Sequence, residues 1–272
     1  MNDLKIVTIG GFFFAVIMIL LSVSESFSQE RCDILYDVFL LIGQSNMSGR
    51  GEILNEDTDT IEGVYLLDDS GRIIPAKAPL NIYSSVRKRA GVQGINPGYS
   101  FSRKVHEATG KNILLVVNAR GGTTLGQWYK DGEQVCFAAS FGDEPDRYGK
   151  KVSLYDEAVS RCKDAMRHGS LRAILWHQGE GNSSDPQSYL TALSVFVRDL
   201  RNDLGVAEDV PFIAGEIFEG FKNAEEFNAN LNNISKFIKN GYCVSSRGCK
   251  AKADSSHFNR EGQLLMGNVT PM

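Results

Sequence analysis

The sequence predicts an α/β fold, a three-layer α/β/α sandwich with a central, mainly parallel sheet. Short apolar runs alternate with amphipathic segments of helical length, and polar, turn-rich loops lie between them. Continuous apolar strands are typical of a parallel sheet that helices cover on both faces. The alternation of strands and helices along the chain also favours right-handed crossovers between parallel strands.

The elements follow in a regular order. The predicted strands are residues 38–42, 112–117, 173–176 and 211–214. The predicted helices are residues 99–109, 154–168 and 187–204. A glycine that is expected to end the helix follows each of them, at Gly110, Gly169 and Gly205.

Two long polar stretches, residues 51–97 and 127–151, interrupt this order. The first contains a turn sequence at residues 68–71 that predicts a hairpin. Loops of this length on a compact domain are often functional. In parallel sheets the loops that leave the carboxyl ends of the strands form the site, so the chemistry is expected there.

The composition excludes several classes of protein. The chain has 272 residues, of which 42% are hydrophobic and 23% charged, and its formal net charge is -4. These values exclude collagens, disordered tails, multi-span membrane proteins and small disulfide-dense proteins. The mild acidity argues against nucleic acid as a partner, because nucleic-acid-binding proteins usually present a basic face. The cysteines and histidines lack the spacing of a zinc site, so we expect neither a metal nor a cofactor.

The N-terminus is the most strongly apolar region. Residues 6–23 carry no charge, Lys5 precedes them, and small residues follow at Ser26 and Ser28. This order predicts a secretory signal peptide over residues 1–28, with an uncleaved membrane anchor or a buried helix as alternatives. Residues 29–272 are then expected to form a single exported domain, which contacts a membrane only if the anchor is retained.

Export makes the cysteines informative, because disulfides persist outside the cytosol. Cys243 and Cys249 flank a turn-rich stretch, and we expect a disulfide between them. Cys162 falls on the inner face of a predicted helix and is expected to be buried. Cys32 and Cys136 could also pair, because the sequence does not determine connectivity.

A serine follows the first predicted strand directly, within Gly43-Gln44-Ser45-Asn46-Met47. Gly43 permits a tight turn, which would hold Ser45 where a substrate can approach. Met47 stands where the nucleophile elbow of α/β-hydrolases has its second glycine, so that fold is disfavoured. Taken alone, Ser45 is equally well explained as the N-cap of a helix.

The second predicted strand ends in a glycine pair, within Ala119-Arg120-Gly121-Gly122-Thr123. Such a pair exposes backbone N–H groups that could bind a developing oxyanion. A tight turn between a strand and a helix is the alternative explanation.

The third predicted strand ends in Trp176-His177-Gln178-Gly179-Glu180. Polar side chains massed at a strand end are costly to bury without partners. His177, Gln178 and Glu180 are therefore expected to line a cleft.

A fourth polar block, Asp254-Ser255-Ser256-His257, lies near the C-terminus. Residues three apart in a helical turn or tight loop can face the same way. A carboxylate so placed could hold the imidazole in one tautomer while the other ring nitrogen takes a proton from a serine. A capping aspartate beside a surface histidine is the alternative.

Together the four blocks resemble the SGNH-hydrolase superfamily, specifically the sialate O-acetylesterase-like domain of carbohydrate esterase family 6, which includes acetyl xylan esterases. The resemblance runs from about residue 38 to residue 267 and follows the order of the blocks. It implies a flavodoxin-like sandwich, a metal-free esterase with a Ser-His-Asp triad, and O-acetylated carbohydrate as the substrate class.

The resemblance also implies a role for each matching residue. Ser45 would be the nucleophile, His257 the general base and then acid, and Asp254 its orienting carboxylate. The oxyanion hole would combine the N–H groups of Ser45 and Gly121 with the side chain of Gln178, which replaces the superfamily's usual asparagine. Further cleft or substrate residues would be Gln44, Asn46, Gly122, His177, Glu180 and Trp128.

Some of these residues keep a second explanation. Trp128 could stack on a sugar ring or pack beneath its loop. His177 is a rival base only if Asp254 and His257 lie far from Ser45. The basic run at residues 87–89 is expected to be solvated rather than to contact an acidic sugar.

Two other functions remain open at this level. One is a non-catalytic carbohydrate-binding protein on the same fold, and the intact serine, histidine and aspartate argue against it. The other is an esterase of short-chain acyl esters that are not carbohydrates.

Overall fold

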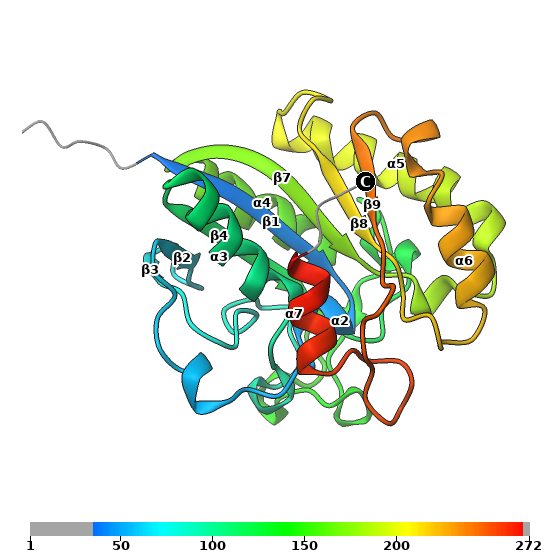
Figure 1. Cartoon of the computed structure of the whole chain (residues 1–272), viewed down its shortest axis with the longest axis horizontal. Helices are drawn as coiled ribbons and strands as arrows, with labels where there is room; N and C mark the ends of the chain where they lie inside the picture. The colour runs from blue at the N-terminus through cyan, green and yellow to red at the C-terminus, as the bar shows by residue number, and fades with distance from the viewer. Residues whose placement is uncertain (1–34, 269–272) are drawn as a thin grey trace, which may run out of the picture. The chain divides into compact units, whose positions relative to one another are not determined.

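The computed structural model describes residues 35–268 and confirms the three-layer α/β/α sandwich (Figure 1). Seven strands form one sheet in the order β3-β2-β4-β1-β7-β8-β9. Every neighbouring pair is parallel except β2 and β3. The strands are β1 (Tyr36–Gly43), β2 (Val64–Leu67), β3 (Ile73–Pro75), β4 (Ile113–Ala119), β7 (Gly169–His177), β8 (Phe212–Gly215) and β9 (Gly241–Val244).

Helices cover both faces of this sheet (Figure 1). They are α2 (Ser45–Ser48), α3 (Pro97–Thr109), α4 (Leu154–Met166), α5 (Pro186–Leu204), α6 (Ala224–Leu231) and α7 (Arg260–Asn268). Alternate residues of β1 enter two separate cores, as the two-residue period of a strand requires. Val38, Leu40 and Ile42 pack with residues of α4, α5 and α6, whereas Phe39 and Leu41 pack on the side of α3.

The four predicted strands are confirmed as β1, β4, β7 and β8, and the three predicted helices as α3, α4 and α5. Gly110 and Gly205 end their helices with a left-handed φ of 64° and 68°. Gly169 does not, because α4 ends at Met166 and Gly169 begins β7. A β-carbon there would lie 1.9 Å from the Tyr36 carbonyl oxygen, so the glycine permits β7 to pair closely with β1.

The expectation of a disulfide between Cys243 and Cys249 is wrong, because both thiols are free. Cys243 lies within β9, where the sequence predicts a turn-rich stretch. Cys162 is fully buried, as predicted. Cys32 and the signal or anchor segment at residues 1–28 lie outside the described residues. Within residues 35–268 no helix is long and apolar enough to cross a membrane.

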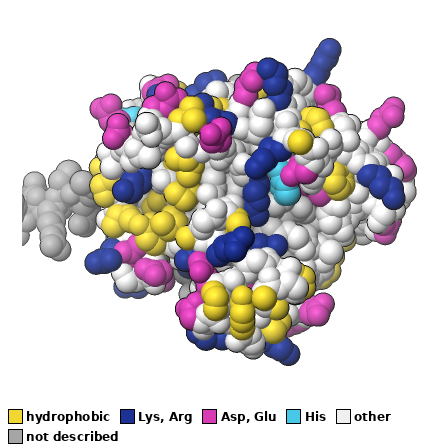
Figure 2. Space-filling view, turned by 90° about the horizontal axis from the view of Figure 1, so that it is seen from below, with side chains coloured by type: hydrophobic (Ala, Val, Ile, Leu, Met, Phe, Trp, Pro, Cys, Tyr) yellow, Lys and Arg dark blue, Asp and Glu magenta, His cyan; other side chains and the backbone are white. Residues whose placement is uncertain are grey.

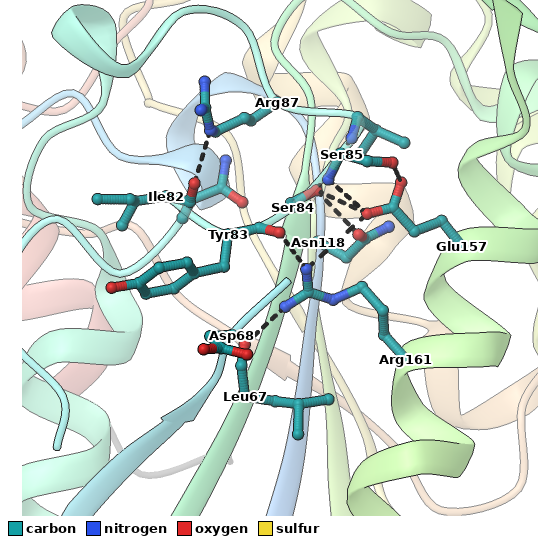
Figure 3. Close-up of polar contacts among 12 residues, drawn as sticks. Leu67, Asp68, Ile82, Tyr83, Ser84, Ser85, Arg87, Asn118, Glu157 and Arg161 are labelled. Atoms are coloured by element: carbon teal, nitrogen blue, oxygen red, sulfur yellow. Dashed lines mark hydrogen bonds and ion pairs between the residues drawn. The ribbon is translucent and has the colours of Figure 1, made fainter. Parts of the chain in front are cut away.

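The predicted hairpin at residues 68–71 joins β2 to β3, and the long loop that follows is fastened to α4 (Figure 3). Glu157 accepts hydrogen bonds from the Ser85 hydroxyl and from the Ser85 N–H at 2.6 Å. Arg161 donates to the carbonyl oxygens of Tyr83 and of Leu67, the latter at 2.9 Å. Two side chains of one helix therefore hold the hairpin and the loop beside the sheet.

A buried ion pair fixes the second long loop. Arg120 and Asp143 are joined by two parallel hydrogen bonds of 2.9 and 2.8 Å, and their side chains are 2% and 0% exposed. Arg120 also donates to the Val86 carbonyl, and Asp143 accepts the Ala138 N–H at 2.9 Å. One buried charge pair thus ties both long loops to the end of β4.

Asp143→Ala should lower the free energy of unfolding by about 3–5 kcal/mol, because the buried guanidinium of Arg120 loses its partner. The matched control is Asp164→Ala, which removes an exposed pair with Arg167 at 3.6 Å and should change stability by less than about 1 kcal/mol. Urea unfolding followed by circular dichroism measures both. Equal losses in the two variants would contradict the role given to the buried pair.

Candidate active site

The carboxyl ends of five parallel strands meet at one edge of the sheet. Gly43 is in register with Ala119 of β4 and with His177 of β7, and Gly215 of β8 is in register with Val244 of β9. Gly43 has a φ of 134°, and a β-carbon on it would lie 2.2 Å from the His177 carbonyl oxygen. Only glycine fits there, so it permits β1 to end close against β7. The segments that follow β1, β4 and β7 then lie side by side.

Ser45 lies at this edge as the first residue of α2. Gln44 is the N-cap of that helix, so the explanation of Ser45 as an N-cap is wrong. A β-carbon built on Gly121 would lie 3.2 Å from the Ser45 Cβ, which places the glycine directly against the serine. The backbone N–H groups of Ser45 and Gly121 donate to no acceptor in the part of the chain that the structure describes, so both are available to a ligand.

Asp254 and His257 form the expected pair, with Asp254 Oδ2 at 2.8 Å from His257 Nδ1. The other oxygen, Oδ1, accepts the backbone N–H groups of Ser256 at 3.0 Å and of His257 at 2.9 Å. Partial burial alone would raise the pKa of Asp254, but these hydrogen bonds lower it to about 2. The carboxylate is therefore ionised at neutral pH, and it fixes the ring in the tautomer that keeps Nε2 free to accept a proton.

The side chain of Asn46 attaches this loop to the serine segment. Its Nδ2 donates to the Ser256 carbonyl at 3.1 Å, and its Oδ1 accepts the Phe258 N–H at 3.0 Å. These two backbone groups flank His257. Within residues 35–268 no hydrogen bond joins the Ser45 hydroxyl to the imidazole, so Asn46 supplies the recorded link between the two segments.

Two further bonds complete the environment of Asn46. Its Nδ2 also donates to Glu180 Oε1 at 2.6 Å, and its Oδ1 accepts from Gln263 Nε2 at 3.2 Å. Asn46 is fully buried, so its expected place as a cleft or substrate residue is wrong. Glu180 acts here as a partner of that buried amide.

The Gln178 side chain is not free to serve as the third oxyanion donor. Its Nε2 donates to the Thr123 carbonyl at 3.3 Å and to Asn182 Oδ1 at 2.8 Å. Its Oε1 accepts the Tyr189 hydroxyl at 2.8 Å, and the residue is fully buried. Both N–H groups have acceptors in the protein, so this prediction is wrong for the structure described.

Two other expected cleft residues belong to the interior. His177 is 1% exposed and its Nε2 lies 3.1 Å from the Glu216 carbonyl oxygen. Burial lowers the pKa of His177. Because the ring is enclosed and its Nε2 faces a backbone carbonyl, it is not placed to act as a rival base. Trp128 is fully buried, and its Nε1 donates to Thr123 Oγ1 at 3.1 Å. It packs beneath its loop and does not stack on a sugar.

Gln44 and Gly122 lie at the site in different ways. Gln44 is buried, and its Oε1 accepts the N–H groups of Gly179 at 3.5 Å and of Gly181 at 3.3 Å, which joins the loops after β1 and β7. Gly122 lines an open hollow beside Gly121. Gln44 therefore connects two segments of the site from inside the protein. Of these two residues, only Gly122 faces solvent.

Two hollows open at this edge of the sheet. One, of about 1020 Å³, contains Arg50, Asp254 and His257 on its wall. The other, of about 550 Å³, extends from the Gly121-Gly122 turn to Phe141. Figure 2 views the molecule from below Figure 1 and shows basic side chains gathered beside a histidine on this face. Arg50 and Phe141 lie outside the four polar motifs, and no local sequence pattern predicts that either residue belongs to the site.

The chemistry of the site is that of acid–base and nucleophilic groups. Among residues 35–268 no cluster of three or more His, Cys, Asp or Glu side chains could hold a metal ion. A serine, an imidazole with a free Nε2 and two free backbone N–H groups suit attack on an ester carbonyl.

The parallel sandwich, with a serine, an Asp–His pair and free backbone N–H groups at the carboxyl edge of its sheet, has the architecture of a carboxylic ester hydrolase. The family model described as carbohydrate esterase, sialic acid-specific acetylesterase matches residues 35–270. The chain therefore belongs to this family of carbohydrate acetylesterases.

Individual relatives agree with this assignment. A protein of Arabidopsis thaliana named "Probable carbohydrate esterase" is 26% identical over 251 residues, which cover 85% of this chain and 86% of that protein. An Arabidopsis thaliana crystal structure has a TM-score of 0.70 at 25% identity, covering 86% of this chain and 94% of that one. The crystal structure of NanS has a TM-score of 0.58 at 19% identity, with the same coverage, and supports the fold.

Asn46→Ala should lower both stability and turnover, because it leaves buried backbone groups beside His257 without partners. We expect the free energy of unfolding to fall by at least about 1–3 kcal/mol. Turnover of the folded variant should fall about 100-fold, as for a displacement of a catalytic group by about 1 Å. The matched control is Asn233→Ala, whose amide bonds only near neighbours in the chain: it donates to the Ala229 carbonyl and accepts from Lys236 Nζ.

Denaturant unfolding and the initial rate of ester hydrolysis measure these effects. Turnover by the Asn46 variant equal to that of the Asn233 variant would contradict the positioning role.

Proposed function

We propose that the protein removes O-acetyl groups from carbohydrate through an acyl-enzyme on Ser45. The observation that carries this proposal is the Asp254–His257 pair, which Asn46 holds beside the serine segment. Membership of a carbohydrate acetylesterase family supports the same reaction.

The proposed reaction proceeds in two acyl-transfer steps. Ser45 Oγ attacks the acetyl carbonyl carbon, His257 Nε2 takes the serine proton, and the carbonyl oxygen becomes an oxyanion that the N–H groups of Ser45 and Gly121 bind. When this intermediate collapses, the bond to the sugar oxygen breaks and His257 protonates that oxygen. His257 then activates a water molecule, which releases acetate and regenerates the serine.

The substrate class that we propose is an acetylated polysaccharide of the xylan type or a smaller acetylated sugar. The hollow beside Gly121 supports it, because Gln127, Gln134 and Lys151 line that hollow together with Phe141, whose side chain is 54% exposed. Sugar sites commonly combine polar groups with an aromatic ring that packs against the face of the sugar. The mild net charge of -4 also suits a neutral glycan.

We also propose that the protein is exported as a single catalytic domain. The charge-free run at residues 6–23 supports export by its resemblance to a signal peptide. Polysaccharide substrates lie outside the cytosol, so export and substrate class agree.

Ser45→Ala should abolish acetate release, with a loss of up to about 10⁶-fold in turnover, because no other group supplies the nucleophile. The variant should keep the wild-type melting temperature, since the Ser45 hydroxyl makes no hydrogen bond within the described residues. Ser194→Ala, on the exposed side of α5, is the matched control. Acetate released from acetyl-xylan is measured by a coupled assay, and near-normal turnover by the Ser45 variant would contradict the mechanism.

Phe141→Ala should lower kcat/KM on acetyl-xylan by about 5-fold, the loss expected for one aromatic contact of about 1 kcal/mol. Activity on a short aryl acetate should not change, because that ester is too short to extend along the hollow from Gly121 to Phe141. Phe237→Ala is the matched control, since Phe237 is 46% exposed and lies outside the hollows.

The wild-type panel of acetyl-xylan, O-acetylated sialic acid and aryl acetate also separates the other functions. Sugar binding without acetate release would indicate a non-catalytic protein. Hydrolysis of the aryl ester alone would indicate an esterase of other acyl esters.

A further inference from the structure

The oxyanion hole described so far has two donors, the backbone N–H groups of Ser45 and Gly121. An oxyanion hole works through donors that are fixed in place and have no other acceptor before the reaction begins. Gln178 does not meet this condition, because both hydrogens of its amide are taken by Thr123 and Asn182. A third donor would therefore have to be another group that reaches the same point.

Arg50 reaches that point. A β-carbon built on Gly121 would lie 2.7 Å from Arg50 Nη2 and 3.2 Å from the Ser45 Cβ. The guanidinium and the serine side chain therefore face the same side of Gly121. Arg50 also lines the hollow whose wall contains Asp254 and His257, so the same side chain borders the space next to the proposed general base.

One half of the guanidinium is anchored and the other half is free. Arg50 Nη1 donates to the Gly49 carbonyl at 2.6 Å, to Ser48 Oγ at 2.7 Å and to the Val92 carbonyl at 3.2 Å. Its Nη2 has no acceptor, and the side chain forms no ion pair, among the described residues. The anchors hold the cation in place before substrate arrives, which is the arrangement that makes an electrostatic donor effective.

Arg50 keeps its charge at the pH of the reaction. Burial lowers the pKa of Arg50 to about 10, and the negative charge of Asp254 opposes part of that decrease. The guanidinium is therefore protonated at neutral pH. A partly buried cation without a paired carboxylate is unfavourable, and an anion that forms beside it relieves that cost.

We propose that Arg50 Nη2 donates the third hydrogen bond to the oxyanion, in the place expected for Gln178. This inference rests on the proposed esterase function. As the Ser45 Oγ–carbon bond forms, the carbonyl electron pair moves to oxygen, and Arg50 binds that oxygen without giving up a proton. When the bond to the sugar oxygen breaks, the pair returns to the carbonyl and the proton on His257 goes to the sugar.

Arg50→Gln tests this role on an uncharged aryl acetate and on acetyl-xylan. We expect kcat to fall about 100- to 1,000-fold on both esters, while KM changes less than about 3-fold, because the oxyanion exists only after attack. Affinity for a small alkylboronic acid, which forms a tetrahedral anion on the serine, should fall by a similar factor. Arg50→Lys, which keeps the charge without the planar fork, should recover only part of the loss.

Lys88→Gln is the matched control. Lys88 is a half-buried cation near the same turn, with Nζ 3.8 Å from a β-carbon built on Gly122, and it is not among the atoms nearest to a β-carbon built on Gly121. Its loss should change kcat on the aryl acetate less than about 3-fold. All rates are referred to folded protein, measured by near-ultraviolet circular dichroism.

Three results would overturn the proposal. The first is an unchanged kcat in the folded Arg50→Gln variant. The second is a loss confined to KM or to esters of acidic sugars, which would make Arg50 a reader of a substrate carboxylate. The third is an equal loss in the Lys88 variant. A wild-type protein that hydrolyses none of the esters would instead contradict the esterase function itself.

Discussion

The buried amide of Asn46 is the interaction on which the proposed active site depends. It follows Ser45 directly and bonds backbone groups on both sides of His257, 210 and 212 residues further along the chain. Strand register alone brings Ser45 beside Gly121, because β1 and β4 are neighbours. The loop that holds His257 comes after the last strand and has no such register, so its position is set by side chains. A fully hydrogen-bonded buried amide can determine the position of this loop, since breaking any one of its hydrogen bonds is costly in free energy.

Buried polar side chains also fix the loops that surround the site. The Arg120–Asp143 pair fixes the end of β4 against two long loops, and Glu157 and Arg161 fasten one of these loops to α4. Buried charges of this kind add little net stability but penalise every arrangement that separates them. The backbone N–H of Gly121 is therefore held on a rigid turn, which is the condition for an effective oxyanion donor.

The sequence was most informative where one segment determines its own structure. Continuous apolar runs marked β1, β4, β7 and β8, and the spacing of Asp254 and His257 marked their pair. Burial of single polar or aromatic side chains was not predictable, because their partners come from other elements: Gln178 bonds Tyr189 of α5, and Trp128 packs against Trp176 of β7 and Phe196 of α5. Short β9 was missed, since four residues beside a turn-rich stretch carry little pattern. Arg50 could be recognised as a candidate oxyanion donor only from the fold, which places its guanidinium against Gly121.

The proposed mechanism requires that Ser45 carry an acetyl group during turnover. Rapid acid quenching of the enzyme with acetylated xylo-oligosaccharide, followed by peptide mass spectrometry, detects this acyl-enzyme. We expect one acetyl group on the peptide that contains Ser45, formed within the first turnover and lost when substrate is exhausted. Acetate release without any acetylated peptide, or with the acetyl group on another residue, would contradict it.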